Sequence, residues 1–580
     1  MTRRSHYDVV IVGAGKAGLT LARHLLLHTD KTVLLLDKRA DLPGPSQKVG
    51  ESLVQTSGFY LCKVLDLQEH LLVEHFLKYN LRFHWKAGGA DNRNMEDYST
   101  SFIRLGSNIP TFQIDRNLLE AHLLQVNAEN PRYELAAGVR DLDVALSEDG
   151  DHRVRFAGAD LTCGWVVDTS GRGGFLKRKL DLEQKNIIRH GSTWFWTDGL
   201  VDIERLTDRP LTERIFDGMR RKTGHMPFFL ATNHFCDEGM WLWVIPLHGK
   251  TSFGLVYDHR VLRPEEVSNA RKLVDFICRK WPLFQHDLPQ RKIIDEGRYI
   301  DFSYDSRVTI SPNRWALAGE AGRFSDPLYS PGGDLIAIYN TLIVDAINGR
   351  DPSRLARKCQ LYEQTMRVMY ESYVPSYSVS YNCLGDQECF TLKYTWELAV
   401  YFGFYVVPMI NNLFTDPAFM QFHMRKYGLL GPINKNLQMF LGAFFDWKKS
   451  NGRLGSPGPT LVDFYQMHPL RDSEKLFYEV GLSQEDAEMV FEKHILRLKE
   501  FARWILAHVH AVVLDDPGVL HNASFLNSLK LRETVFDPER MRAAYAAHAG
   551  NTEMYHWNLD PCALETFLHC GDKMPQETTV

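Results

Sequence analysis

Short apolar runs separated by a helical pattern open the chain. Residues 7–12 (YDVVIV) form a continuous, β-branched apolar run, which is typical of a buried parallel strand. Residues 19–27 repeat apolar side chains at helical spacing, and residues 32–36 (TVLLL) form a second run of the strand type. The pattern predicts a strand–helix–strand unit at the start of the chain.

Further apolar patterns predict strands and helices mixed along the first part of the chain. Strands are expected at residues 81–85, 154–156, 165–167, 240–245, 251–256 and 315–318, and helices at 116–127 and 265–280. Beyond about residue 335, long helical patterns dominate, including 354–373 and 484–513. We therefore expect an α/β region over residues 1–345 and a mainly helical region over 346–580.

Composition excludes several classes of protein. The 580 residues have a formal net charge of -5 and a mean hydropathy of -0.27, and 44% of them are hydrophobic. These values exclude a mainly disordered, collagen-like or coiled-coil chain. The weak negative charge argues against a nucleic-acid partner. The apolar stretch 398–410 is shorter than the ~20 residues of a membrane span, so no span is predicted.

The cysteines carry little functional information. There are nine, and no two of them form a CxxC pair, so no metal site is expected. Sparse cysteines without a pairing pattern are typical of reduced thiols, and we predict a cytoplasmic protein.

The first turn of the chain has the form GxGxxG. It comprises Gly13, Ala14, Gly15, Lys16, Ala17 and Gly18, between the first predicted strand and the first helix. Glycines in this pattern allow a tight turn, close approach of a pyrophosphate, and close packing of helix on strand. Asp37 ends the second strand about 20 residues later, where a carboxylate can bind a ribose diol. The unit predicts a dinucleotide site.

Three further segments favour FAD over NAD. They are the string 168–172 (DTSGR), the pair Gly319-Glu320 after a predicted strand, and Arg116 at a strand-to-helix passage. Together they resemble the FAD-binding fold of aromatic hydroxylases, in which the late Gly-acidic pair contacts the ribityl chain. That family usually has Gly-Asp, and this chain has Glu320 instead. One GxGxxG is present, so a second Rossmann domain for NAD(P)H is not evident.

The string 241–246 (WLWVIP) has the form WxWxIP. Residues two apart on a strand point to the same face, so Trp241 and Trp243 should line one surface, with Pro246 ending the ladder. Combined with the N-terminal GxGxxG, this string resembles the flavin-dependent halogenases. The fold implied is a Rossmann-like FAD-binding domain, an interleaved β-sheet module on the substrate side and a mainly helical C-terminal region.

Two more strings fit the resemblance. Residues 324–333 (FSDPLYSPGG) match the family pattern FxxPxxSxG, a loop that lies against the flavin and binds the halide. The matching halide residues are Pro331 and Gly332, beside Gly333 on the cofactor side. Pro331 has no N–H to donate, so Gly332 and Gly333 must provide the donors. The string 50–52 (GES) matches a flavin-side motif containing Glu51, and Lys78 follows it at the position of the halogenase lysine.

The resemblance implies a reaction and its components. Reduced FAD, dioxygen and chloride or bromide would give hypohalous acid, which passes to Lys78 beside the substrate, while Trp241 and Trp243 screen the substrate from the flavin. A separate flavin reductase would supply reduced FAD. Tryptophan halogenases have glutamate where this chain has Tyr329, so we expect an electron-rich, phenolic substrate of secondary metabolism, either free or bound to a carrier.

Other interpretations remain open at this stage. An aromatic-ring flavin monooxygenase shares the nucleotide motifs but leaves WxWxIP and Lys78 unexplained, and a non-catalytic flavoprotein would need a degraded site. The aromatic segment 394–405 fits either a substrate wall or the core. We expect the core, because buried aromatic residues usually serve packing.

Overall fold

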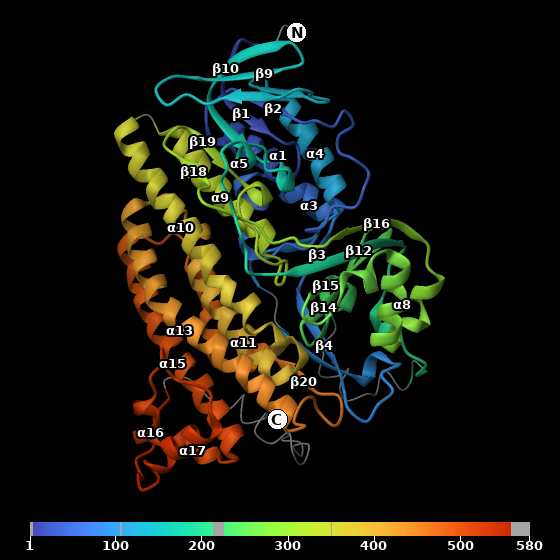
Figure 1. Ribbon diagram of the computed structural model, residues 1–580, viewed down its shortest axis with the longest axis vertical. Coiled ribbons are helices and arrows are strands. Elements are labelled where there is room, and N and C mark those ends of the chain that lie inside the picture. The colour runs from blue at the N-terminus through green and yellow to red at the C-terminus, as the bar shows by residue number, and fades with distance from the viewer. Residues whose placement is uncertain (1–3, 105–106, 211, 213–225, 350, 558–580) are drawn as a thin grey trace.

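The computed structural model describes residues 4–104, 107–210, 212, 226–349 and 351–557. Two large sheets and a column of long helices make up this part of the chain (Figure 1). The last residues of the predicted helical region, 558–580, lie outside the described part.

The first sheet contains the N-terminal unit. Its central path runs β18-β19-β10-β1-β2-β7, and β1 pairs in parallel with both β2 and β10. Parallel strands covered on both faces read as continuous apolar runs, which is why the first strands were recognisable from the sequence. The strands are β1 (His6–Val12), β2 (Val33–Leu36), β7 (Tyr133–Ala136), β8 (Asp143–Ala145), β9 (His152–Phe156), β10 (Ala159–Asp168), β18 (Ile310–Ser311) and β19 (Trp315–Leu317).

The second sheet is mostly antiparallel and has the order β16-β12-β15-β14-β13-β4-β5-β20. Its last strand comes from the helical region and pairs in parallel with β5. The strands are β4 (Asn80–Lys86), β5 (Tyr98–Phe102), β12 (His190–Asp198), β13 (Ala231–Asp237), β14 (Met240–Leu247), β15 (Lys250–Asp258), β16 (Ile293–Tyr299) and β20 (Leu461–Asp463). Two small ladders join β3 (Phe76–Lys78) to β6 (Thr111–Gln113) and β11 (Glu183–Gln184) to β17 (Asp305–Ser306).

Helices of the first region cover the sheets. Among them, α1 packs against both α4 and α9. They are α1 (Lys16–His28), α2 (Gln55–Phe59), α3 (Gln68–Glu74), α4 (Arg116–Ala128), α5 (Phe175–Lys179), α8 (Ala270–Lys280) and α9 (Pro331–Asn348). The division that we proposed at residue 345 falls inside α9.

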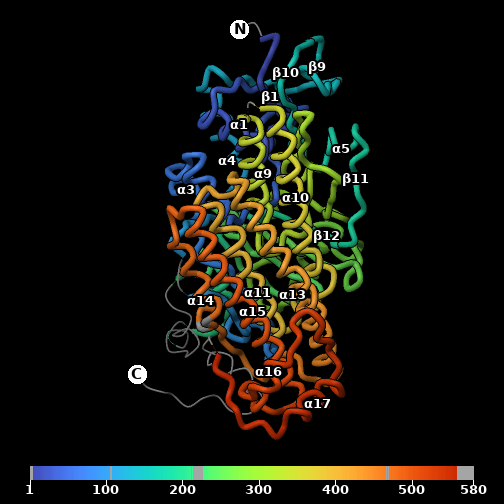
Figure 2. Tube along the Cα trace, turned by 90° about the vertical axis from the view of Figure 1, so that its left-hand side faces the viewer, coloured from blue at the N-terminus to red at the C-terminus, as the bar shows by residue number. Residues whose placement is uncertain are grey.

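The helical column consists of α10, α11, α13 and α15, which pack side by side (Figures 1 and 2). Asp-Pro pairs begin several of these helices because aspartate caps the free N–H groups and proline suits the first helical position. Asp351, Asp416 and Asp537 each accept such a capping bond. The helices are α10 (Pro352–Ser378), α11 (Gln387–Tyr401), α12 (Val407–Ile410), α13 (Pro417–Ser450), α14 (His468–Glu474), α15 (Gln484–Leu514), α16 (Ala523–Ser528) and α17 (Pro538–Ala546).

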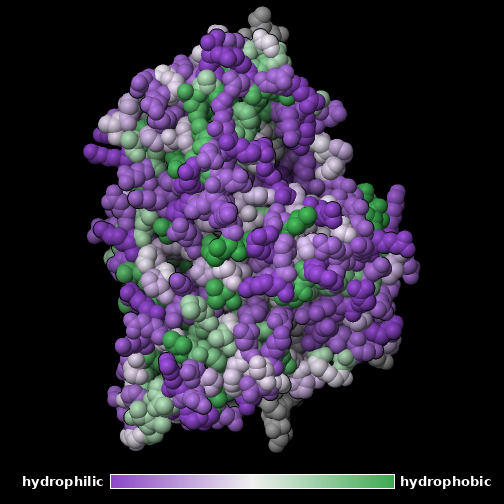
Figure 3. All heavy atoms as spheres, viewed as in Figure 1, coloured by the Kyte–Doolittle hydropathy of each residue, from purple (hydrophilic) through white to green (hydrophobic). Residues whose placement is uncertain are grey.

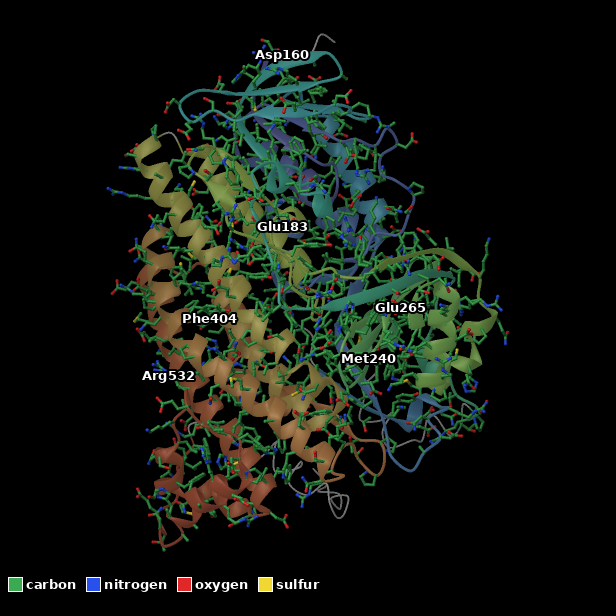
Figure 4. The ribbon with its side chains drawn as sticks, viewed as in Figure 1. Asp160, Glu183, Met240, Glu265, Phe404 and Arg532 are labelled. Carbon is green, nitrogen blue, oxygen red and sulfur yellow. The ribbon has the colours of Figure 1, made fainter. Side chains whose placement is uncertain are left out.

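One hydrophobic core joins the two regions. A single cluster of buried side chains extends from Val9 on β1 through Trp241 on β14 to Phe404 and Trp504 in the helical column. Figure 4 labels Phe404 in that column and Met240 on the second sheet. The face in Figure 3 is largely hydrophilic, with small scattered apolar groups. In the part of the chain that the structure describes, no helix is long and apolar enough to cross a membrane.

The predicted fold class is confirmed. The main difference is at Pro246, which was expected to end its ladder and instead lies within β14, opposite Thr251 of β15. On the other side, the β13 ladder stops earlier, at Val244. Proline is tolerated here because the side of the strand beyond Val244 has no ladder to interrupt.

Candidate active site

The GxGxxG turn lies between β1 and α1 and packs on the end of β10. A Cβ on Gly13 would come within 2.6 Å of the Thr169 carbonyl oxygen, and one on Gly18 within 2.0 Å of the Gly13 carbonyl oxygen. Gly13 also has a φ of +114°, which favours glycine. A Cβ on Gly15 would meet no atom within 4 Å. The turn is therefore closed on two sides and open at Gly15, as a cradle for a pyrophosphate requires.

The remaining residues of the turn serve the protein's own packing. Ala14 donates its N–H to Asp37 Oδ2 at 2.7 Å, and Arg39 also donates to both oxygens of Asp37. Arg39 and the two N–H bonds hold the pKa of Asp37 low against the effect of burial. Ala17 faces Gly319, where an added Cβ would come within 3.1 Å of the Ala17 Cβ. Asp37 thus lies at the end of β2, beside the turn, as the sequence predicted.

Cationic groups gather around Glu320. The positive charges of Arg116, Arg172, Lys16 and Lys177 all act on its carboxyl, although burial still raises its pKa. Arg116 Nε is buried without a hydrogen-bond partner among the described residues. Four cations beside an open glycine turn, one of them with an unused donor, suit the diphosphate of a dinucleotide.

The segment Gly50-Glu51-Ser52 joins this cradle to the second predicted feature. The Gly50 carbonyl oxygen accepts a hydrogen bond from Lys16 Nζ at 3.2 Å. The Glu51 carboxylate is buried and accepts a bond from Trp196 Nε1 at 2.6 Å. Burial raises the pKa of Glu51 to about 7. Ser52 Oγ in turn accepts a bond from Lys78 Nζ at 2.9 Å.

Lys78 ends β3 and is only 4% exposed. Burial lowers the pKa of its amine to about 7, although the negative charge of Asp334 acts in the opposite sense. The side chain lines a cavity. The same cavity is lined by Tyr329 and Pro331 of the 324–333 loop, which brings two of the predicted site elements together.

The loop leads directly into α9. Tyr329 and Ser330 both have positive φ, 68° and 63°, and Pro331 is the first residue of the helix. Gly332 and Gly333 then lie in its first turn, where backbone N–H groups lack partners within the helix. A Cβ on Gly333 would come within 2.9 Å of Ser57. The segment predicted to bind halide therefore lies at the N-terminus of a helix, where Pro331 has no N–H to donate.

Trp241 and Trp243 share one face of β14, as the strand period predicted. Their ring centroids are 5.9 Å apart, and both side chains belong to the main core, while the intervening Leu242 belongs to another cluster. Trp243 Nε1 donates to Ser252 Oγ at 3.0 Å, and Trp241 Nε1 donates to Tyr381 Oη at 2.7 Å. Tyr381 also donates to Asp326 of the loop at 3.3 Å. The tryptophan strand is thus linked to the loop.

Sequence reasoning missed the contribution of the helical region to the cavity. We expected segment 394–405 to be core, and its buried side chains do belong to the main core. In addition, Tyr394, Leu398, Tyr401 and Tyr405 line the cavity, because they recur on one face of the helix. Their spacing of three to four residues was the available signal. Trp396 and Phe404 of the same segment are fully buried core residues.

Three carboxyl groups of the cavity were also missed: those of Asp334, Glu397 and Glu474. Asp334, in the first turn of α9, accepts bonds from the Ser57 N–H and from the Tyr401 hydroxyl, each at 2.7 Å, and burial raises its pKa to about 6. Glu397 of α11 lines the cavity as well. No group of three or more His, Cys, Asp or Glu side chains that could hold a metal occurs among the described residues.

Comparisons with known proteins agree with this geometry. A family model described as tryptophan halogenase matches residues 8–190. The flavin-dependent halogenase chlA of Dictyostelium discoideum is 25% identical over 444 residues, which cover 72% of each chain. The 1H-pyrrole-2-carbonyl-[peptidyl-carrier protein] chlorinase of Pseudomonas fluorescens is 24% identical over 373 residues, which cover 60% of this chain and 78% of the chlorinase.

The fold is shared with solved structures. The halogenase PltM in complex with phloroglucinol and FAD has a TM-score of 0.59 and 16% identity, covering 85% of this chain and 96% of PltM. The predicted resemblance to the flavin-dependent halogenases, with FAD as the cofactor, is therefore confirmed.

Proposed function

We propose that this protein halogenates an electron-rich, phenolic small molecule in secondary metabolism, through hypohalous acid delivered to Lys78. The observation that carries the proposal is the buried Lys78 amine, which lines one cavity with Tyr329 and Pro331 of the FxxPxxSxG loop. Bound FAD in its reduced state supplies hypohalous acid from dioxygen and halide. The cavity lining confines that acid to one side chain that can capture it.

Lys78 suits the capture of an electrophilic halogen. Its amine has a pKa of about 7 because of burial, so a substantial fraction is neutral near pH 7 and can act as a nucleophile. The bond to Ser52 Oγ fixes the direction of the amine. The Asp334 carboxyl, on the same cavity wall, can balance the charge of the protonated form.

The proposed halide site is the first turn of α9. Gly332 and Gly333 present backbone N–H groups there, and the positive end of the helix dipole favours an anion. Pro331 shapes the turn by its fixed φ and lines the cavity without donating. Trp241 and Trp243 are proposed to keep the substrate away from the flavin, so that the ring receives halogen and no hydroxyl group.

The cavity chemistry supports a phenolic substrate. Seven tyrosines line it, so its wall is aromatic and carries several hydroxyl groups: Tyr79, Tyr329, Tyr373, Tyr377, Tyr394, Tyr401 and Tyr405. PltM, which shares the fold, was solved with phloroglucinol, a phenol, and the related pyrrole chlorinase acts on a carrier-bound acyl group. Both free and carrier-bound phenols therefore belong in the test.

The test is a coupled assay. Purified protein, FAD, a flavin reductase with NADH, dioxygen and chloride or bromide are combined with phenols and indoles, free and carrier-bound, and products are read by mass spectrometry for halogen isotope patterns. Halogenated phenol that is absent when Lys78→Ala replaces the wild type supports the proposal. Hydroxylated product, or no aromatic product with any acceptor, contradicts it. The predicted separate reductase and cytoplasmic location remain part of the proposal.

A further inference from the structure

Glu397 of α11 has one saturated and one free carboxylate oxygen. Its Oε1 accepts hydrogen bonds from Ser376, from Lys393 and, at 3.0 Å, from Gln438 Nε2. Its Oε2 is buried and has no hydrogen-bond partner within the described chain. Three donors on one oxygen fix the orientation of the carboxylate, so the free oxygen points in a defined direction.

Buried Lys393 pairs with this carboxyl group. The lysine lies one turn before Glu397 on the same helix, its side chain is fully buried, and the two groups form an ion pair. A buried carboxyl oxygen without a donor costs considerable free energy, because it has lost its hydration and gained no hydrogen bond in return. The arrangement is therefore incomplete without a donor supplied from elsewhere.

The missing donor belongs in the substrate cavity. Glu397 lines that cavity together with Lys78, Tyr329 and Tyr377, and it also lines a smaller pocket beside Ser376, the donor to its Oε1. The hydroxyl groups of Tyr329 and Tyr377 are buried and lack partners at hydrogen-bond distance among the residues described. Burial, the negative charge of Glu397 and the closeness of its carboxyl group to the hydroxyl raise the pKa of Tyr329 well above its ordinary value. A carboxyl oxygen and two tyrosine hydroxyls on one wall match a ligand that carries hydroxyl groups.

We propose that Glu397 Oε2 accepts the hydrogen bond of the substrate's phenolic hydroxyl and takes its proton during halogenation. This inference rests on the proposed function and adds the residue that selects phenols. As a ring carbon forms its bond to halogen, the halogen–oxygen bond of hypohalous acid breaks and hydroxide leaves. Transfer of the phenolic proton to Glu397 yields a neutral dienone. The ring carbon then loses its proton to the hydroxide, which becomes water, and the dienone oxygen recovers its proton from Glu397. The sum is arene plus hypohalous acid giving haloarene plus water.

The experiment compares Glu397→Gln with wild type on two matched ligands. Phloroglucinol carries hydroxyl groups, whereas 1,3,5-trimethoxybenzene has the same ring activation but no proton to donate. Affinity for the FAD-loaded protein is measured by calorimetry, and turnover with reduced FAD and bromide is measured separately. We expect Glu397→Gln to weaken phloroglucinol binding and kcat/KM by about 10-fold or more, as for a hydrogen bond to a charged group. The ether should change by less than about twofold, within ordinary scatter.

Two further variants control for packing. Glu388→Gln removes a buried carboxylate from the same helix, where Glu388 pairs with Lys448 and His508, and should leave both ligands unaffected. Glu397→Gln leaves Lys393 without its carboxylate, so the double variant Lys393→Met with Glu397→Gln restores charge balance should the single variant fold poorly. A thermal melt reports folding in each case.

The outcomes separate this inference from the proposed function. Selective loss of the phenol supports Glu397 as the acceptor. Equal loss of both ligands, or unchanged phenol binding in a folded variant, overturns it while phenol halogenation by the wild type stands. Should the wild type halogenate indoles and bind no phenol, the phenolic class itself fails and this inference fails with it.

Discussion

Lys78 Nζ donates a hydrogen bond of 2.9 Å to Ser52 Oγ, and this bond joins the two halves of the site. Ser52 belongs to the segment whose Gly50 carbonyl oxygen binds Lys16 of the nucleotide turn. Thr232 of β13 also donates to Ser52 Oγ, at 2.9 Å. The segment Gly50-Glu51-Ser52 therefore connects the predicted cofactor cradle to the cavity. Its serine holds the Lys78 amine at the cavity wall.

Lys78 should be essential for halogenation and dispensable for flavin oxidation. Lys78→Ala removes the amine that we propose captures hypohalous acid, and Lys78→Arg replaces it with a guanidinium that stays charged and has a different shape. Both variants should oxidise reduced FAD at the wild-type rate and yield little or no haloarene. The measurement is product formed per FAD oxidised. Lys86→Ala, at the exposed end of β4, is the control and should match the wild type. If Lys78→Ala gave as much product per FAD oxidised as the wild type, Lys78 would have no role in halogenation.

Ser52 should position Lys78 without taking part in the chemistry. Ser52→Ala removes the acceptor of the Lys78 bond, which should lower product per FAD oxidised by about 10-fold, the usual effect of losing a bond to a charged group. The pKa of Lys78 should fall further, because the ammonium form loses its partner. Ser192→Ala is the matched control. The Ser192 hydroxyl is as buried as that of Ser52 but has no hydrogen-bond partner among the described residues, so its removal breaks no bond. An unchanged yield and pKa in Ser52→Ala would show that the bond is incidental.

The state of Lys78 predicts a pH dependence. Its pKa is lowered from 10.5 to about 7 by burial, so the amine is charged below about pH 7 and neutral above it. If the neutral amine captures halogen, product per FAD oxidised should rise as pH increases through 7. A yield that falls over the same range would favour an ammonium that only hydrogen-bonds hypohalous acid. Enzyme carrying ¹³C-methylated lysines gives the pKa by NMR, with Lys78→Met identifying the signal.

The same shift makes stability depend on pH. Between about pH 7 and 10.5 the unfolded chain holds a proton on Lys78 that the folded protein has lost, so the contribution of this residue to the free energy of unfolding rises with pH. Below pH 7 both states are protonated and the full cost of burying the charge applies. Lys78→Met should be more stable than the wild type at pH 6, with the advantage shrinking towards pH 10 in urea titrations. A constant difference would contradict a lowered pKa.

The cofactor half of the site could be predicted from the sequence because its signals are local. Gly13, Gly15 and Gly18 occur within six residues. The structure shows close backbone packing at Gly13 and Gly18 and open space at Gly15, as the motif predicts. The alternation in β14 likewise assigned Trp241 and Trp243 to one face without any tertiary knowledge.

The substrate half could not be predicted, because it is assembled from distant segments. Glu397 and Tyr401 reach Lys78 and Asp334 from a helical region that carries no motif. Only the helical spacing of Tyr394, Leu398 and Tyr401 hinted at a shared face, and that spacing is also typical of core. Helix–core packing decides between the two, and it depends on long-range contacts. Pro246 was misplaced for a related reason: whether it interrupts a ladder depends on where the neighbouring strand stops.

Electron supply should require a partner enzyme. The chain has one dinucleotide fingerprint, which we assign to FAD, and no second GxGxxG for a nicotinamide cofactor. NADH or NADPH alone should therefore give less than a few per cent of the turnover seen with a flavin reductase or with chemically reduced FAD. Oxygen consumption on adding NADPH to the purified protein is the measurement. Efficient turnover without a reductase would favour a monooxygenase of the hydroxylase type.

The glycines of the nucleotide turn should separate cofactor binding from folding. Gly15 has extended backbone angles, φ -94° and ψ -175°, and a Cβ there meets no atom within 4 Å, so Gly15→Val should fold and melt like the wild-type apoprotein. The valine fills the space that the pyrophosphate needs, and FAD binding should be lost. Gly18→Val should instead destabilise the apoprotein itself, because its Cβ would come within 2.0 Å of the Gly13 carbonyl oxygen. FAD titration followed by flavin absorbance, with a thermal melt of each apoprotein, tests both. Normal FAD affinity in Gly15→Val would contradict the cradle at this turn, since no other open glycine lies between Gly13 and Gly18.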